Sequence, residues 1–327
     1  MRAICLFSGG LDSMLAVKVM QEQGIEVIAV NFNFGLGSAS DRRVHLQKVA
    51  DEVGCKLVIA DVREDYIKNV LFSPKHGYGS AFNPCIDCHG NMFKWAKKYM
   101  DEYDAQFVIS GEVLNERPMS QRKDAMIKVE EISGLKGLVL RPLCAKFFEP
   151  SIPETEGWVD RDKLLDIQGR SRHRQFELVE KYGIKYFEKP GGGCLLTEEF
   201  MATKMKDFIK YDSTFTVDDI NVVKYGRHFR LSEKAKLVVG RNQEDNEQLK
   251  KVENEKFYKI IMPENLMGPV SLLSKTATDE DKKLAAKIIL TYARSQKDQK
   301  YSLLFGDESI EEMPYESKND VREKMLL

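Results

Sequence analysis

The feature that most constrains the fold is an alternation of short apolar runs with helix-forming segments along the first third of the chain. The apolar runs cover residues 3–7, 26–32, 56–61 and 107–111, with helix-forming sequence at 41–53 and 91–103 among the intervening segments. Strands joined through helices favour right-handed crossovers, which place the strands parallel in one sheet covered on both faces. The sequence therefore predicts an α/β domain with a Rossmann-like parallel sheet.

Residues 8–13, with the sequence SGGLDS, separate the first apolar run from the helix that follows it. The two glycines let backbone N–H groups converge on an anion, and a helix start favours negative charge. Ser8 and Ser13 can donate hydrogen bonds to phosphate oxygens. Asp12 would repel phosphate, so we expect it to hold Mg²⁺. The alternative, a simple capped turn, is disfavoured by the position, the spacing and the flanking strand.

Residues at the ends of other runs are expected near this loop. Asn31 and Phe32 end the second run, and Gly111 ends the fourth. Ligands of parallel sheets bind at the carboxyl ends of the strands, so this position alone predicts that these residues line the adenosine. The predicted ATP-binding residues are Ser8, Gly9, Gly10, Asp12, Ser13, Asn31, Phe32 and Gly111.

The SGGLDS loop resembles the signature of the PP-loop ATP pyrophosphatases, and it lacks the Gly-Lys-Ser/Thr ending of a Walker loop. The resemblance covers about residues 1–195 and implies an adenine nucleotide alpha hydrolase-like fold. It also implies that ATP is cleaved between its α and β phosphates and that AMP is transferred to a carbonyl oxygen.

Six cysteines offer a second kind of chemistry. Cys5 and Cys55 lie in or beside apolar runs and are expected to be buried, and Cys144 is expected to be structural. Cys85 and Cys88 form a C-x-x-C, which by itself fits zinc, redox or iron–sulfur use. The remaining cysteine follows a glycine-rich stretch at 191–193, which favours close approach to a cluster. His89, next to Cys88, is badly placed to complete a zinc site.

The motif Asn-Pro-Cys-x-x-Cys at 83–88, with Gly-Gly-Cys ending at Cys194, resembles the tRNA thiouridine synthetases of the same superfamily. In the iron–sulfur members three cysteines hold a 4Fe-4S cluster with one open iron, and here these would be Cys85, Cys88 and Cys194. A two-cysteine persulfide mechanism is the second interpretation, and zinc or no function is the third. The predicted catalytic residues are Asp12, Cys85 and Cys194.

Two basic segments, residues 170–174 and 227–241, are candidates for RNA contact. The net charge of −1 gives no indication that the whole molecule binds polyanions. Residues 224–246 resemble the NFACT-R module, which is associated with RNA binding, and this resemblance would cover about residues 212–305. A solvated charged surface is the alternative. The predicted RNA-binding residues are Arg170, Arg172, Arg174, Arg227, His228, Arg230 and Arg241.

The predicted organisation is a PP-loop domain at 1–210, a smaller α+β domain at 211–305 and a poorly ordered polar tail at 306–327. No membrane span or signal pattern is found, so we expect a cytoplasmic location. The expected function is ATP-dependent thiolation of a tRNA uridine with ATP, Mg²⁺ and a 4Fe-4S cluster. The expected partners are tRNA and a sulfur donor, either sulfide or a persulfide carrier protein, and a homodimer stays open. The alternatives are a PP-loop enzyme acting on a small molecule and a non-enzymatic RNA-binding protein, against which the complete loop argues.

Overall fold

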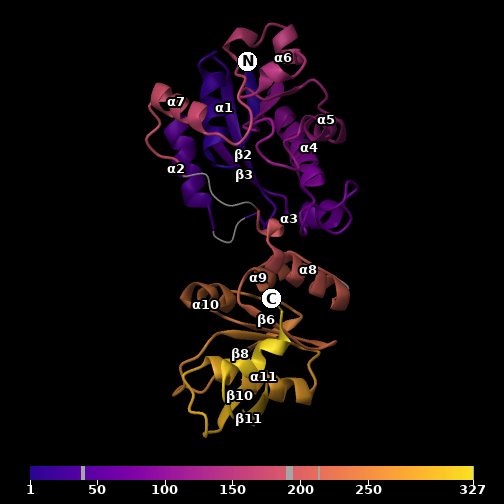
Figure 1. The fold of residues 1–327 in the computed structure, drawn as a ribbon, viewed down its shortest axis with the longest axis vertical. Helices are drawn as coiled ribbons and strands as arrows, with labels where there is room; N and C mark the ends of the chain where they lie inside the picture. Colours follow the sequence, from indigo (N-terminus) through magenta and orange to yellow (C-terminus); the bar gives the residue numbers. More distant parts are fainter. Residues whose placement is uncertain (38–40, 189–193, 213, 327) are drawn as a thin grey trace. The chain divides into compact units, whose positions relative to one another are not determined.

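The structure is a computed structural model that describes residues 1–37, 41–188, 194–212 and 214–326. The chain forms two compact units, Met1–Leu195 and Leu196–Leu327 (Figure 1). The predicted boundary at residue 210 lies inside helix α8 (Glu199–Tyr211). Asp207 of this helix pairs with Arg230 and Lys236 of the second unit, so α8 belongs to that unit and the boundary lies earlier.

The first unit is built on a five-stranded parallel sheet with the strand order β3-β2-β1-β4-β5. The strands are β1 (Arg2–Leu6), β2 (Glu26–Asn33), β3 (Lys56–Asp61), β4 (Phe107–Ser110) and β5 (Val139–Leu140). The predicted parallel-sheet α/β class is confirmed. The order reverses at β1, since β2 and β3 lie on one side of it and β4 and β5 on the other. The loop after β1 therefore lies at a topological switch point, where sheets of this kind bind ligands.

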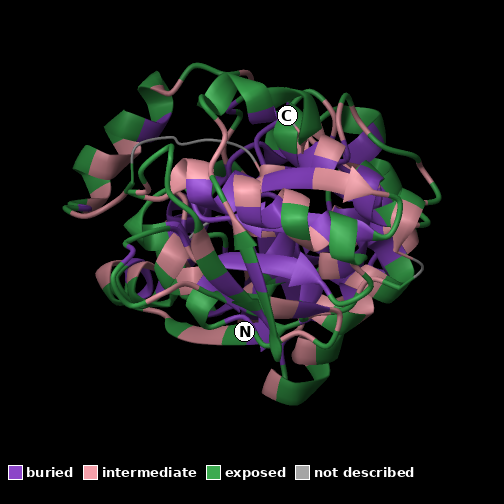
Figure 2. Cartoon of the chain, turned by 90° about the horizontal axis from the view of Figure 1, so that it is seen from below, coloured by how far each residue is buried: buried purple, intermediate pink, exposed green. Residues whose placement is uncertain are grey.

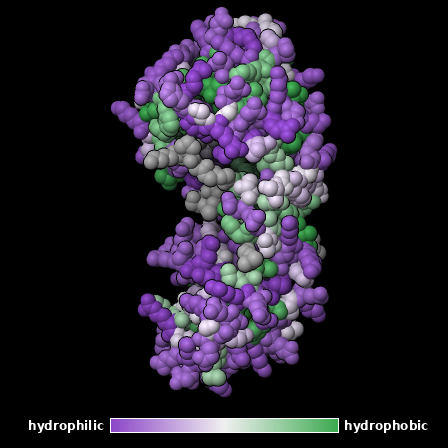
Figure 3. Space-filling model, viewed as in Figure 1, coloured by the Kyte–Doolittle hydropathy of each residue, from purple (hydrophilic) through white to green (hydrophobic). Residues whose placement is uncertain are grey.

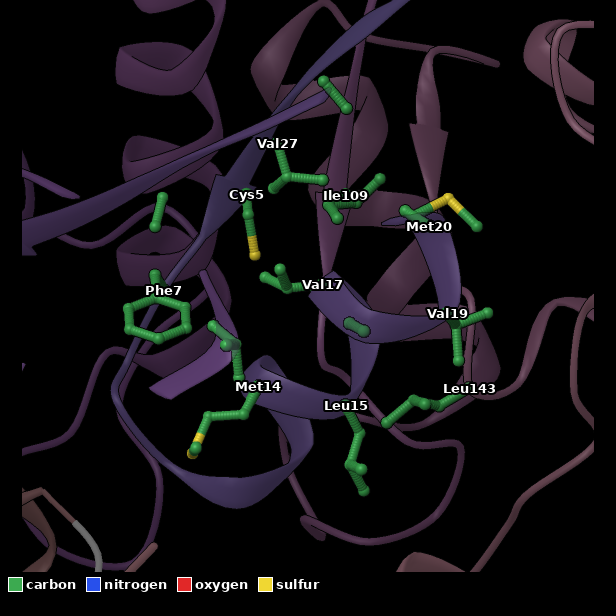
Figure 4. Packing of buried hydrophobic residues seen from close by; sticks show 14 of the residues in the cluster. Cys5, Phe7, Met14, Leu15, Val17, Val19, Met20, Val27, Ile109 and Leu143 are labelled. Atoms are coloured by element: carbon green, nitrogen blue, oxygen red, sulfur yellow. The ribbon is translucent and has the colours of Figure 1, made fainter. Parts of the chain in front are cut away.

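Helices cover both faces of this sheet, because alternate residues of each strand point to opposite faces. One face carries α1 (Leu11–Gln21), α2 (Arg43–Val53) and α7 (His173–Tyr182), and the other carries α4 (Cys85–Tyr103) and α5 (Lys123–Ser133). The short helices are α3 (Arg63–Tyr66), η1 (Ile67–Leu71), η2 (Ala145–Phe147), α6 (Ile152–Thr155), η3 (Arg161–Lys163) and η4 (Leu195–Thr197). Figure 4 shows Cys5 in the same apolar cluster as Met14 and Val17 of α1, so this thiol is buried as expected.

Three elements of the first unit differ from the prediction. Helix α4 begins at Cys85 and not near residue 91, which places the C-x-x-C in its first turn. Helix α5 and strand β5 were not predicted. β5 is too short to give a periodic signal.

The second unit has a seven-stranded sheet with the order β11-β10-β8-β9-β7-β6-β12, in which the paired strands run antiparallel. Its strands are β6 (Arg227–Ser232), β7 (Ala235–Val239), β8 (Phe257–Ile261), β9 (Ser271–Ser274), β10 (Tyr301–Phe305), β11 (Glu308–Glu312) and β12 (Met325–Leu326). Besides α8 it contains α9 (Asp219–Lys224), α10 (Gln243–Lys250), α11 (Asp279–Tyr292) and η5 (Lys318–Lys324). Between α9 and β6 the chain turns at Gly226, which takes a left-handed φ of 80°.

The prediction of a poorly ordered tail from residue 308 is wrong. β11 pairs with β10 along its whole length, and β12 pairs with β6 at the opposite edge of the sheet. Ile310 is 8% exposed and Val321 is fully buried, so a few apolar side chains anchor a segment whose composition is otherwise polar. Composition misses this order because alternate residues of an edge strand face solvent.

The burial pattern agrees with two separately packed cores. Figure 2 shows the strands largely buried, and Figure 3 shows mainly hydrophilic side chains on the face in view. Among the described residues, no helix is long and apolar enough to cross a membrane.

Candidate active site

Residues 8–13 form a loop that turns on itself between β1 and α1. Gly9 has a φ of 75°, a conformation that any residue with a Cβ atom adopts only with strain. The Gly10 N–H donates to Ser8 Oγ at 3.2 Å, and Ser13 Oγ donates to the Gly10 carbonyl at 2.7 Å. Gly10 caps α1, and N–H groups in the first turn of a helix have no intrahelical partner. The loop thus has the geometry of an anion site.

Two side chains hold this loop in place. Asn31 Nδ2 donates to the carbonyl oxygen of Phe7 at 2.7 Å, so it fixes the end of β1. His45 Nε2 lies 3.1 Å from the Gly9 carbonyl, and His45 Nδ1 lies 3.1 Å from the Tyr186 hydroxyl. The imidazole therefore connects the loop to the segment that follows α7. His45 was not predicted, because an isolated histidine in a helix gives no sequence signal.

Phe32 does not lie beside the loop, contrary to the prediction. Its side chain is 6% exposed and packs edge-on against Tyr99 of α4, with ring centroids 6.0 Å apart. The reason is the two-residue period of β2, which turns Phe32 to the face opposite α1 while Asn31 points to the loop.

Gly111, directly after β4, lies against the backbone of the loop. A Cβ atom at this position would come within 2.4 Å of the Ser13 nitrogen and 2.5 Å of the Asp12 carbonyl carbon. Backbone atoms cannot give way as a flexible side chain can. Gly111 therefore sets the distance between β4 and the start of α1.

We expect Gly111→Ala to weaken ATP binding by about tenfold or more, because the added methyl must displace the first turn of α1. The matched control is Gly24→Ala. Gly24 has a strained φ of 76°, but no atom lies within 4 Å of its Cβ position. Both variants should lose some stability, and only Gly111→Ala should lose affinity in a nucleotide titration. Equal affinities for the two variants would contradict this role.

Asp12, expected to hold Mg²⁺, is contacted by two side chains. Arg172 Nη1 lies 2.5 Å from Asp12 Oδ2, and the other Arg172 nitrogen pairs with Glu116 Oε1. Gln175 Nε2 donates to Asp12 Oδ1 at 3.3 Å. Burial and the charge of Asp12 raise the pKa of Glu116, and Arg172 opposes this shift. Arg172, predicted to contact RNA, therefore lies beside the SGGLDS loop, where its guanidinium pairs with Asp12 and Glu116.

The cysteines predicted as one set do lie near one another. Cys85 is the first residue of α4, and Asn83 Nδ2 donates to its Sγ at 3.1 Å. Cys88 is one turn further and almost fully buried. Burial raises the pKa of the Cys88 thiol strongly, and the nearby thiol of Cys194 adds to the shift, ahead of Cys85. Cys194 Sγ also lies 3.5 Å from the carbonyl oxygen of Leu36.

Tyr66 completes the surroundings of these thiols. Its hydroxyl is buried and has no hydrogen-bond partner of normal geometry among the described residues. Burial raises its pKa, and the neighbouring Cys88 and Cys194 raise it further. Three neighbouring thiols suit a soft metal or a sulfur-containing group, since thiolates are soft ligands. In the ranges that the structure describes, no group of three or more His, Cys, Asp or Glu side chains is arranged to hold a single metal ion.

A buried charge network, which the sequence reasoning missed, connects the thiol helix to the end of β4. Glu112 Oε2 lies 2.9 Å from Arg141 Nε, and Glu112 Oε1 lies 2.9 Å from His89 Nδ1. Burial alone would raise the pKa of Glu112, but Arg141 and His89 hold it at about 2. Arg141 also pairs with Glu130 of α5. His89 therefore joins the thiol helix α4 to Glu112 through its Nδ1.

Most of the predicted RNA-binding residues are engaged within their own unit. His228 is fully buried, and its Nε2 lies 2.9 Å from the carbonyl oxygen of Tyr225, so it cannot contact RNA as predicted. Arg230 is paired with Asp207, and Arg241 with Asp245. Arg227 lies over the ring of Tyr292, and Arg174 pairs with Asp166. Arg170 is exposed, as expected of a residue that contacts a large ligand.

The first unit combines a Rossmann-like parallel sheet with a glycine loop at its switch point, an arrangement typical of nucleotide-binding domains of the PP-loop class. Residues 1–131 match the family model of the tRNA methyl transferase HUP domain, and residues 226–323 match that of the NFACT protein RNA binding domain. Both predicted resemblances are thereby confirmed. The NFACT match extends well beyond residue 305 and so includes most of the segment that was predicted to be a tail.

Curated relatives match parts of the first unit. The tRNA-specific 2-thiouridylase MnmA 2 of Fusobacterium nucleatum is 33% identical over 107 residues, which are 32% of this chain and 31% of the relative. A probable tRNA sulfurtransferase of Thermococcus kodakarensis is 29% identical over 171 residues, which are 51% of this chain and 39% of the relative. A 7-cyano-7-deazaguanine synthase of a Sulfurovum species is 38% identical over 86 residues, which are 26% of this chain and 36% of the relative. The chain spans about a third of the length of the first of these relatives.

Among solved structures, a 4-thiouridine synthetase–RNA complex with bound ATP is 18% identical and covers 68% of this chain and 52% of that chain. Its TM-score of 0.38 is too low to support an argument about the site.

Proposed function

We propose that this protein is an ATP-dependent tRNA sulfurtransferase that replaces a uracil carbonyl oxygen with sulfur. The observation that carries the proposal is the proximity of Cys194 to Cys88, which brings a thiol from far along the chain to the C-x-x-C helix. The same unit carries the anion-binding loop after β1. Relatives named as tRNA thiolation enzymes support this reading.

In the proposed reaction, backbone N–H groups of the loop and the start of α1 bind the ATP phosphates, and Asp12 holds Mg²⁺. The uracil carbonyl oxygen bonds to the α phosphorus while the bond between the α phosphorus and the bridging oxygen breaks, which releases pyrophosphate. Loop amides aimed at the phosphates stabilise the negative charge that develops there. A sulfur nucleophile then bonds to the uracil ring carbon that carries the adenylated oxygen. The bond between this carbon and that oxygen breaks, and AMP leaves with the oxygen.

The thiols would deliver the sulfur. A 4Fe-4S cluster held by Cys85, Cys88 and Cys194 would supply an open iron able to carry sulfide. In the alternative form of the proposal, Cys85 and Cys194 act as a persulfide pair. For the cluster, sulfide is the proposed donor. For the persulfide pair, the proposed donor is a persulfide carrier protein, whose outer sulfur passes to the attacking thiolate while the carrier leaves as a thiolate. The NFACT-type unit would bind the tRNA, with Arg227 and Arg241 as its proposed phosphate contacts. Arg170 of the first unit is a further proposed phosphate contact.

The test is a reaction of the anaerobically purified chain with ATP, Mg²⁺, sulfide and unmodified tRNA. We expect AMP release that depends on tRNA, together with a thiolated nucleoside detected by mass spectrometry of the digested tRNA. AMP release at the same rate with and without tRNA would instead favour an enzyme acting on a small molecule. The similarity to a 7-cyano-7-deazaguanine synthase makes this the second candidate. No AMP formation with either class of substrate would refute ATP use.

A further inference from the structure

Two carboxylates of different elements meet beside the nucleotide loop. Asp12 belongs to the first turn of α1, and Glu116 lies in the segment between β4 and α5. Their side chains are 17% and 8% exposed, so water screens their mutual repulsion poorly. A cation between their oxygens would stabilise the ionised form of this pair.

Arg172 supplies that cation in this structure. One guanidinium nitrogen contacts Asp12 Oδ2, and another contacts Glu116 Oε1, so a single positive group bridges the two carboxylates. Carboxylate oxygens are also the ligands that Mg²⁺ prefers in proteins. The guanidinium therefore stands where a divalent cation bound by both residues would lie.

Gln175 gives an independent indication that a ligand belongs at this place. It is fully buried, and its amide nitrogen reaches Asp12 Oδ1 at 3.3 Å. Its amide oxygen has no hydrogen-bond partner among the described residues. A hydrated cation on Asp12 would bring water molecules able to donate to that oxygen.

We propose that Asp12 and Glu116 together form the divalent-cation site used with ATP, and that the Arg172 guanidinium competes with the divalent cation for this site. When Mg²⁺ and ATP bind, the guanidinium is displaced and becomes available to the phosphates, for which its paired N–H groups are suited. Arg172 lies at the junction before α7, so its side chain can move without unwinding that helix. The proposal rests on the proposed use of ATP, but not on tRNA or the cysteines.

The test measures binding of Mn²⁺ alone, without nucleotide, by the electron paramagnetic resonance signal of the free ion. We expect Arg172→Gln to bind Mn²⁺ at least about tenfold more tightly than the wild type, because the competing cation is gone. The added affinity should disappear in Arg172→Gln/Glu116→Gln. Arg174→Gln is the matched control, since Arg174 pairs with the exposed Asp166 and should not change Mn²⁺ affinity.

Two outcomes would overturn the proposal. One is Arg172→Gln binding Mn²⁺ no more tightly than the wild type or Arg174→Gln. The other is tighter binding that survives removal of the Glu116 carboxylate. If Arg172→Gln does not fold, Glu116→Gln decides the matter in the wild-type background. Glu116→Gln should lower the affinity for Mn²⁺ in the presence of ATP and leave the affinity for ATP without metal unchanged. Equal losses of these two affinities would count against the site. AMP formation by the wild type tests ATP use separately, so the two failures are distinguishable.

Discussion

Replacing Cys194 by serine should reduce tRNA thiolation by on the order of 10⁴-fold, as expected for a residue that works as part of a catalytic unit. The serine oxygen is a poor ligand for soft metals and cannot carry a persulfide. ATP binding should persist, because Asn31 and His45 hold the SGGLDS loop in place. Neither of these contacts involves Cys194. The measurement is the yield of thiolated nucleoside by mass spectrometry.

Cys55→Ser is the control for this substitution, since Cys55 packs against the core beside β3 and is not a member of the thiol set. It should thiolate at the wild-type rate. Cys88→Ser then separates the two sulfur mechanisms. Loss of activity supports the three-thiol site, and retained activity supports the persulfide pair of Cys85 and Cys194. A Cys194→Ser variant that works normally would remove this residue from the mechanism.

Replacing Arg141 by methionine should destabilise the first unit by about 3–5 kcal/mol, because it leaves the carboxylates of Glu112 and Glu130 without their buried counter-charge. Urea unfolding followed by tryptophan fluorescence measures this effect. The chain has two tryptophans, Trp95 and Trp158, and both lie in the first unit. The signal therefore reports on that unit alone.

The pH dependence of this loss follows from Glu112. Its pKa of about 2 in the folded protein lies below the ordinary carboxyl value. Its contribution to stability is therefore present above the ordinary value and is lost as the pH falls towards 2. The destabilisation by Arg141→Met should accordingly be larger at pH 7 than at pH 3. Arg122→Met is the control, because the Arg122–Asp124 pair is exposed and contributes little. A loss no greater than that of the control would show that the network is not stabilising.

The sequence predicts the core of the first unit well, because period and turn signals are strongest there. β3 begins and ends at the predicted residues, and the loop after β1 lies where a strand-to-helix glycine turn requires. The proximity of Cys194 to Cys88 was predicted by a resemblance between motifs. Spacing alone could not give it, because the two residues approach each other only in the folded unit.

The errors arise where tertiary contacts decide the outcome. Arg172 and His228 were both predicted on basic segments, yet one neutralises buried carboxylates and the other is enclosed in a core. The network of Glu112, Arg141 and His89 gives no sequence signal, because its members come from three separate elements. The segment after residue 308 is polar in composition, and its pairing with β10 makes part of it the regular edge strand β11.

The place of β1 in its sheet determines how freely different parts of this protein can change. β1 pairs with β2 on one side and β4 on the other, so the register of the loop that follows it is set twice. A one-residue insertion in β1 would shift the loop against both neighbours and against Gly111. The border strands β3 and β5 are each joined to one described neighbour, and changes there leave that register intact. The borders of the sheet can therefore vary in sequence and length, both in evolution and in engineering, while the loop at its centre keeps its register.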